Sequence, residues 1–283
     1  MDPNTPLLVY GTAWKKGKTA ELTGTAVRSV FAAVDTANYP TACSEPLTGN
    51  GIAVALKSGI KRSDLFIQIK FTRVWAHERD KIPFNPDQSI KGQIKESIQQ
   101  SLEHLHVDYL DALLLHIPFA EDSDNLVGWK VFESFVPLNI RALSVSSFSL
   151  AQLEDLYANA TIKPSIIQNC FYRETGFDID LREFCKERGI TYHAYWMIKH
   201  IPEASTSKLL ASVAKKLKVE KELAFYILVV GLGGTQVLDG SAKPERMLRG
   251  LKAVNEVFGS RAVLYELQPE IEKFRQLLLE LAV

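Results

Sequence analysis

The chain has 283 residues, of which 46% are hydrophobic and 23% charged, the ordinary balance of a folded globular protein. This composition excludes a disordered chain, a coiled coil and a collagen-like repeat. Lysine plus arginine equals aspartate plus glutamate at 33 each, so the formal net charge is zero. Because nucleic acids and anionic membranes attract proteins through a basic excess, we expect neither as a partner.

Cysteine usage and apolar runs indicate the compartment. The three cysteines, Cys43, Cys170 and Cys185, are too scattered for a disulfide framework, and no Cys-x-x-Cys pair suggests zinc. The first residues lack the charged and apolar regions of a signal peptide. No apolar run reaches the roughly 18 residues needed to span a bilayer. We therefore expect a cytoplasmic protein without a bound metal.

Short apolar runs alternate with longer amphipathic stretches along the chain, which predicts alternating strands and helices. The predicted strands are, in order, Leu7–Thr12, Ala32–Ala37, Leu65–Thr72, Tyr109–His116, Ile140–Ser146, Ser165–Cys170, Thr191–Trp196 and Thr235–Asp239.

The clearest helix is predicted over Ser89–Leu105, where apolar residues recur on one face of a 3.6-residue period. A helix over Arg182–Gly189 ends with cationic residues before a glycine, which is a stop signal. Another is expected to begin at Lys243–Pro244, since proline is tolerated in a first turn. A last helix is predicted over Gln268–Leu281.

Eight strands alternating with helices favour parallel strands with crossover helices. We predict a (β/α)8 TIM barrel over residues 1–283 as one domain, with a short C-terminal helix. A doubly wound sheet is the competing architecture, but it usually carries a Gly-x-Gly-x-x-Gly turn after its first strand. The first predicted strand here ends Tyr10-Gly-Thr-Ala-Trp14, with a single glycine.

Polar residues close several of the apolar runs, and in a barrel the chemistry lies at the C-terminal ends of the strands. Asp35, Lys70 and His116 end three successive predicted strands and should face one another across the barrel mouth. A carboxylate beside a buried lysine keeps the ammonium charged, and the ammonium can lower the pKa of a nearby phenol. Tyr39, just after Asp35, is the nearest candidate for such a proton donor.

With these residues the sequence resembles the aldo-keto reductase family, most closely its fungal-type members. Five segments occur in the family's order over nearly the whole chain. They are Val-Asp-Thr-Ala-Asn (34–38), Ile-Gln-Ile-Lys (67–70), Asp-Tyr-Leu-Asp-Ala-Leu-Leu-Leu-His (108–116), Ile-Gln-Asn-Cys-Phe-Tyr (167–172) and Arg-Glu-Phe-Cys-Lys-Glu-Arg-Gly-Ile (182–190).

The resemblance implies NADPH-dependent carbonyl reduction, with hydride from the nicotinamide C4 and a proton from a tyrosine. By position, Lys70 would polarise that tyrosine, Asp35 would pair with Lys70, and His116 would orient the carbonyl. The residues implied to bind the cofactor are Gly11 and Thr12 beneath it, Ser146, Ser147 and Gln168 at the nicotinamide amide, Tyr195 stacked on the ring, and Ser241 and Arg246 at the 2′-phosphate.

The match departs from the family at the tyrosine. Tyr39 lies four residues after Asp35, whereas many members place the tyrosine five after, and fungal-type members eight after, where Cys43 stands. The proton donor is therefore Tyr39 or Cys43, with Tyr39 preferred. Ser147 replaces a usual asparagine, and Gly240 and Gly250 stand where lysine and asparagine are frequent. These changes lower the expected cofactor affinity but keep Arg246, which favours NADPH over NADH.

The leading hypothesis is a reductase of an aldehyde or ketone. Two alternatives remain: a non-redox lyase, isomerase or cyclase with an altered site, and a cofactor-binding protein without catalysis. The loops Trp75–Pro86 and Lys199–Ser207 should cover the mouth. Four aromatic residues would line a cleft that suits a bulky apolar or aromatic carbonyl, Trp75, Phe84, Phe119 and Trp196. Nothing in the sequence indicates an oligomeric state.

Overall fold

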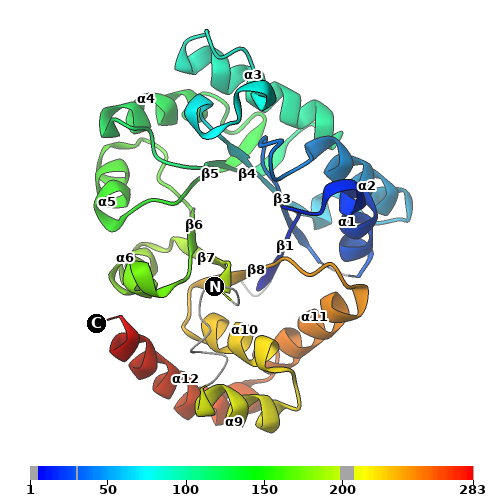
Figure 1. The fold of residues 1–283 in the computed structure, drawn as a ribbon, viewed down its shortest axis with the longest axis vertical. Coiled ribbons are helices and arrows are strands. Elements are labelled where there is room, and N and C mark those ends of the chain that lie inside the picture. The colour runs from blue at the N-terminus through cyan, green and yellow to red at the C-terminus, as the bar shows by residue number, and fades with distance from the viewer. Residues whose placement is uncertain (1–5, 30, 198–206, 283) are drawn as a thin grey trace.

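A ring of parallel strands surrounds the centre of the molecule, with helices outside it (Figure 1). The computed structural model describes residues 6–29, 31–197 and 207–282. Within them the strands follow one another in chain order around a closed barrel, and the first pairs with the last. The strands are β1 (Leu8–Gly11), β2 (Ala33–Asp35), β3 (Phe66–Phe71), β4 (Leu110–Leu115), β5 (Ile140–Ser146), β6 (Ile166–Cys170), β7 (Thr191–Tyr195) and β8 (Thr235–Asp239). The predicted (β/α)8 barrel is confirmed.

The helices cover the outside of the ring. They are α1 (Thr19–Arg28), α2 (Glu45–Lys57), α3 (Ile90–Leu105), α4 (Asp122–Glu133), α5 (Leu150–Asn159), α6 (Ile179–Arg188), α9 (Lys208–Leu217), α10 (Lys221–Gly231), α11 (Pro244–Phe258) and α12 (Arg261–Leu281). No helix of the described residues is long and apolar enough to cross a membrane.

Local signals explain several helix boundaries. Ser89 caps α3 by accepting a hydrogen bond from Gly92, and α6 ends at a left-handed Gly189. The predicted start of α11 at Pro244 is confirmed. Short 3₁₀ helices connect other elements at Lys16–Lys18, Arg62–Asp64, Val74–Ala76, Arg79–Lys81 and Arg173–Asp178.

The last helix differs from its prediction, because it begins at Arg261 rather than Gln268 and is the 21-residue α12. Pro269 therefore lies inside the helix and not in its first turn. Ser260 caps the start, and buried apolar residues face the core on both sides of the proline. Packing of that face compensates for the local cost of proline inside the helix. A prediction from sequence pattern sees the proline but not the packing, so it starts the helix too late.

Apolar side chains fill the layer between strands and helices, whereas much of the barrel interior is polar. Along β3, Ile67, Ile69 and Phe71 pack outward in the main core. The intervening Gln68 and Lys70 are buried on the opposite face. Barrel interiors are usually filled by branched apolar residues, so this polar centre marks a functional region.

Close helix packing depends on glycine at Gly49 of α2. A Cβ there would clash with the carbonyl oxygen of His104 and lie 2.8 Å from the Cα of Leu105. The backbones of α2 and α3 therefore touch at this point, which fixes how the two helices sit against each other.

We expect Gly49→Ala to lower the free energy of unfolding by about 1–3 kcal/mol, because backbone atoms must move to admit the methyl group. Urea denaturation followed by circular dichroism measures this. Gly17→Ala is the matched control, since nothing lies within 4 Å of a Cβ at Gly17. Equal stabilities of the two variants would contradict the contact.

Candidate functional site

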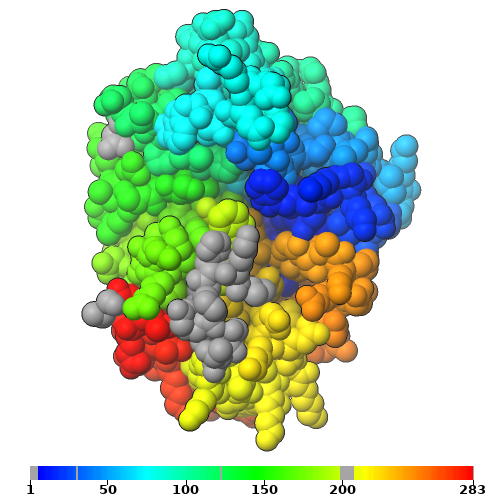
Figure 2. All heavy atoms as spheres, in the orientation of Figure 1, coloured from blue at the N-terminus to red at the C-terminus, as the bar shows by residue number. Residues whose placement is uncertain are grey.

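A cavity of about 920 Å³ opens at the C-terminal ends of the strands. It extends from the barrel centre to the start of α11, and the segment after β1 and the start of α11 border it on the face in Figure 2. Ten residues proposed from the sequence line it: Gly11, Asp35, Tyr39, Lys70, His116, Ser146, Gln168, Tyr195, Ser241 and Arg246. The structure thus brings together residues that are up to 235 positions apart, from 11 to 246.

Two proposed cofactor residues do not line this cavity. Thr12 is fully buried, and its hydroxyl donates to the carbonyl oxygen of Asp35 at 3.0 Å. Ser147 lines a second cavity of about 760 Å³ that also borders Tyr195. Ser147 adopts a left-handed backbone conformation with φ 60°, which turns it away from the first cavity. Thr12 is thus joined to the backbone of Asp35. Ser147 contacts the site through its backbone N–H, which donates to the carbonyl oxygen of Gln168 at 3.2 Å, and through a hydrogen bond with Tyr195.

The centre of the site is the buried carboxylate of Asp35. Its Oδ1 accepts hydrogen bonds from Lys70 Nζ at 2.5 Å, Gln68 Nε2 at 2.5 Å and Gln168 Nε2 at 3.1 Å. Lys70 Nζ also donates to the carbonyl oxygen of Thr36 at 3.2 Å. An ion pair removed from water in this way is stable only when further hydrogen bonds satisfy it, and here the two amides do so.

His116 lies just beyond β4, and its position is fixed by Thr72. The Thr72 hydroxyl and His116 Nδ1 are 2.7 Å apart. Burial and the charge of Lys70 lower the pKa of His116 to about 3, although the Asp35 carboxylate opposes this. The imidazole is therefore neutral at pH 7, so it acts through hydrogen bonding and not as a cation.

The two candidate proton donors occupy different parts of the cavity wall. The Tyr39 ring packs edge-on against His116 and His77, with centroids 5.7 and 5.4 Å apart. Burial raises the pKa of Cys43 to about 12, while the charge of Lys70 lowers it. Among the described residues no hydrogen bond joins Lys70 to Tyr39, whereas Lys70 is near enough to act on the Cys43 thiol.

The far end of the cavity lies at a helix start, where Lys15 and Arg246 line it together with the carboxylates of Asp239 and Glu222. Ser241 and Arg246 flank the first turn of α11, and within the described residues Arg246 forms no ion pair with a carboxylate. Lys15, from the segment after β1, donates to the carbonyl oxygen of Gly240 across the cavity. A free guanidinium and an open helix start together suit a phosphate group.

The expected aromatic cleft is only partly correct. Trp196 lines the cavity, together with Trp14. Trp75 is instead 63% exposed beneath the Arg73 guanidinium, and Phe84 is buried in the core against Phe71. Phe119 packs at the core edge against Gly128. The loop over 75–86 thus supports the core; Lys199–Ser207 lies outside the described residues except for Ser207.

Sequence pattern missed two buried polar residues and one wall of the cavity. His193 and Gln236 are adjacent in register on β7 and β8, next to the expected Gln168 on β6. Burial lowers the pKa of His193 to about 4, so it is neutral at pH 7. Period-two alternation on these strands was the signal that could have identified them. Glu222 and Tyr226 of α10 also line the cavity, and nothing in their local sequence indicates it.

The sequence profile of the Aldo/keto reductase family matches residues 9–215. The NAD/NADP-dependent indole-3-acetaldehyde reductase of Schizosaccharomyces pombe is 34% identical over 205 residues, covering 69% of this chain and 66% of the relative. The glyoxal reductase of Bacillus subtilis is 31% identical over 192 residues, covering 68% and 62%. Both alignments span less than two thirds of the relative's own length.

Solved structures share the fold. An aldo-keto reductase enzyme from a Medee basin deep-sea metagenome library has a TM-score of 0.71 at 24% identity, covering 89% of this chain and 91% of its own. A Bombyx mori aldo-keto reductase in complex with NADP has a TM-score of 0.71 at 21% identity, covering 89% and 88%.

The Asp35–Lys70 pair predicts a non-additive effect on stability. Lys70→Met leaves a buried carboxylate without its cation and should cost about 3–5 kcal/mol of unfolding free energy. Adding Asp35→Asn removes the unpaired charge, so the double variant should be more stable than the sum of the single variants by at least about 1 kcal/mol. Urea denaturation of all four proteins tests this, and additive losses would argue against a coupled pair.

Proposed function

The chain belongs to the Aldo/keto reductase family, whose profile covers more than half of it, and on that basis we propose that it reduces an aldehyde or ketone with NADPH. The observation that carries this proposal is one cavity that joins the Asp35–Lys70 pair and His116 to the end at Ser241 and Arg246. Such a cavity would hold one elongated ligand, with a reaction centre at one end and a phosphate site at the other.

The residues present fit the cofactor. Arg246, Ser241 and the first turn of α11 would hold the 2′-phosphate. Tyr195 would stack on the nicotinamide, and Gln168 would accept a hydrogen bond from its amide through Oε1, since its Nε2 is committed to Asp35. When bound, NADPH supplies the hydride. The name of the S. pombe relative as NAD/NADP-dependent supports this cofactor class.

His116 would orient the substrate carbonyl. Its Nδ1 is engaged with Thr72, which leaves Nε2 toward the cavity among the described residues. A neutral imidazole can donate one hydrogen bond to a carbonyl oxygen without drawing a full charge into the site. Lys70 adds a fixed positive charge nearby, which favours negative charge on that oxygen as it develops.

The proton would come from Tyr39, which lies against His116 on the cavity wall. Its hydroxyl is a stronger hydrogen-bond donor than a thiol. Cys43 is the second candidate because the Lys70 charge acts on it and because its raised pKa keeps the thiol protonated at pH 7. Both candidates belong to one short segment, so the reacting oxygen would lie beside that segment in either case.

The substrate would be a bulky apolar or aromatic carbonyl compound. Trp14, Trp196, Tyr39 and Met197 provide apolar wall around the reacting end. The name of the S. pombe relative, an indole-3-acetaldehyde reductase, supports an aromatic aldehyde as the first compound to test.

Cofactor discrimination tests the phosphate end. We expect Arg246→Ala to raise the Kd for NADPH roughly 10–100-fold, the effect of losing one charge-assisted contact, and to leave the Kd for NADH within about twofold. Quenching of Trp14 and Trp196, which both line the cavity, reports binding. Lys252→Ala is the control, since Lys252 lies on α11 outside the cavity and pairs with Glu256. An NADPH affinity unchanged by Arg246→Ala would remove this phosphate site.

Turnover of an aromatic aldehyde tests the proton donor. We expect Tyr39→Phe to lower kcat by about 10²–10⁴-fold, the usual contribution of general acid catalysis, with NADPH affinity retained. Cys43→Ser should retain most of the activity. The opposite pattern would assign the proton to Cys43, and Cys43→Tyr would then be expected to keep or raise kcat.

Two outcomes would favour the alternative functions. Saturable NADPH binding without turnover over a broad carbonyl panel would indicate a cofactor-binding protein without catalysis. Turnover of a carbonyl compound without any cofactor would indicate a lyase, isomerase or cyclase.

A further inference from the structure

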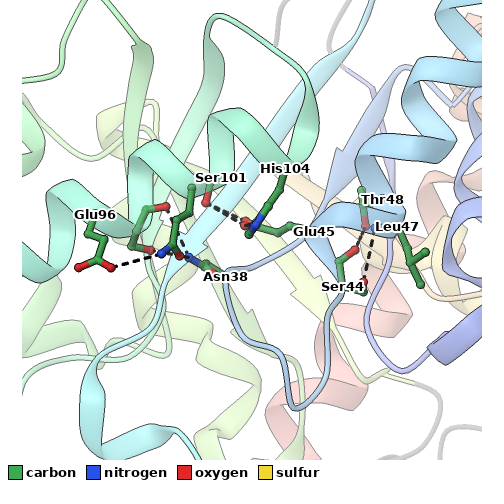
Figure 3. A network of polar contacts seen from close by, with 10 residues as sticks. Asn38, Ser44, Glu45, Leu47, Thr48, Glu96, Ser101 and His104 are labelled. Atoms are coloured by element: carbon green, nitrogen blue, oxygen red, sulfur yellow. Dashed lines mark hydrogen bonds and ion pairs between the residues drawn. The ribbon is translucent and has the colours of Figure 1, made fainter. Parts of the chain in front are cut away.

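One short segment carries both candidate proton donors. Residues 36–44 connect β2 to α2, and Tyr39 and Cys43 lie in this connection between Asn38 and Glu45, the first residue of α2. Both ends contact the same helix, α3, through the side chains of Asn38 and Glu45 (Figure 3). The position of either donor therefore depends on how α3 holds this segment.

The first contact is made by Asn38. Its Nδ2 donates to Ser97 Oγ at 3.1 Å and lies 3.3 Å from Gln100 Oε1. Asn38 itself is buried, and its backbone N–H donates to the carbonyl oxygen of Lys70 at 3.2 Å. This end of the segment is thus joined to the barrel and to α3 together.

The second contact is made by Glu45, whose side chain is 1% exposed in the first turn of α2. Ser101 Oγ lies 2.9 and 3.0 Å from its two carboxylate oxygens, and His104 Nδ1 lies 3.5 Å from Oε2. Ser97, Ser101 and His104 are spaced i, i+4 and i+7 along α3, so they share one face of the helix. Figure 3 shows Ser101 and His104 converging on Glu45.

Two further features restrict movement at this point. Gly49, one turn after Glu45, lets the α2 backbone contact the backbone of His104. Ser44, between Cys43 and Glu45, caps α2 by accepting a hydrogen bond from Leu47 N at 3.4 Å. The end of the segment next to Cys43 is therefore fixed by a helix cap, a backbone contact and a buried carboxylate.

Groups from α3 and β3 act on the pKa of the Glu45 carboxyl and of its partner His104. Burial raises the pKa of Glu45, and its contacts with His104 and Ser101 oppose that rise. The contact with the Glu45 carboxylate raises the pKa of His104, whose side chain is 37% exposed. Lys70 on β3 also acts on Glu45, and Glu103 of α3 acts on His104. When it carries a proton, His104 is the cation of α3 that contacts Glu45.

We propose that Glu45, held by Ser101 and by protonated His104, is a positioning residue that fixes the segment carrying Tyr39 and Cys43. The effect of this positioning on turnover rests on the proposed reductase function. The effect on the position of the segment is independent of that function.

The direction of the pH dependence follows from His104, whose pKa is raised from 6.5 in the folded protein. Its contribution is lost as pH rises from there through that raised pKa. The pair also needs an ionised Glu45 carboxylate, so a rise in pH above neutrality removes the charge of His104 and leaves that of Glu45. The segment should therefore loosen as pH rises above neutrality.

Cysteine alkylation can measure this without any turnover. Burial raises the pKa of both Cys43 and Cys170 to about 12, so the thiolate fraction of each rises in parallel between pH 6 and 9. The ratio of their iodoacetamide labelling rates, measured by peptide mass spectrometry, then reports the position of Cys43. In the wild type we expect this ratio to rise about two- to fivefold over that range, as for loss of one partly exposed ion pair.

His104→Asn keeps a neutral donor near the same position and should make the ratio independent of pH. His106→Asn is the matched control and should retain the rise, since His106 at the end of α3 contacts Asn50 of α2 and not Glu45. Ser101→Ala should raise the ratio at every pH. Labelling of the buried Cys185 must stay slow in all variants, which separates segment loosening from global unfolding.

A flat ratio in the wild type, or an unchanged rise in His104→Asn, would overturn the proposal. If the ratio behaves as expected, kcat should fall over the same pH range in the wild type and not in His104→Asn. If the labelling ratio responds to pH as expected but no carbonyl compound is reduced, the positioning role of Glu45 is supported. That result would count against the reductase function alone.

Discussion

The buried carboxylate of Asp35 is the interaction on which the site depends. Three donors from two other strands converge on its Oδ1, and one of them is the Lys70 ammonium. A carboxylate in the middle of a barrel is tolerated only with such support, so β2, β3 and β6 are held together by the same charge that organises the reaction centre. The neighbouring polar layer of His193 and Gln236 continues this support toward β8.

The same charges decide what the surrounding groups can do. Lys70 and burial together keep His116 neutral, which limits it to hydrogen bonding. Burial keeps the Cys43 thiol protonated even beside an ammonium. The centre of the site thus holds one ion pair, with the Lys70 ammonium as its positive member, and neutral donors around it. Such a set suits stabilisation of an oxygen that becomes negative during a reaction.

Much of the barrel could be predicted from sequence, because strand and helix periods differ and because Asp35, Lys70 and His116 end successive apolar runs. The start of α12 could not, since tertiary packing overrides the preference of Pro269. Ser147 lines the second cavity and adopts a left-handed backbone conformation, which a linear match does not reveal. Phe84 and Trp75 were misplaced for a similar reason: an aromatic residue in a loop can as well complete the core as line a cleft.

The pairing of β1 with β8 links the cavity to the closed state of the ring. One wall of the cavity comes from residues 11–18 and another from residues 238–246. A barrel whose β1–β8 pairing is open therefore lacks one side of the cavity. A small molecule that contacted both walls would bind only the closed ring, so its binding would stabilise the β1–β8 pairing by mass action.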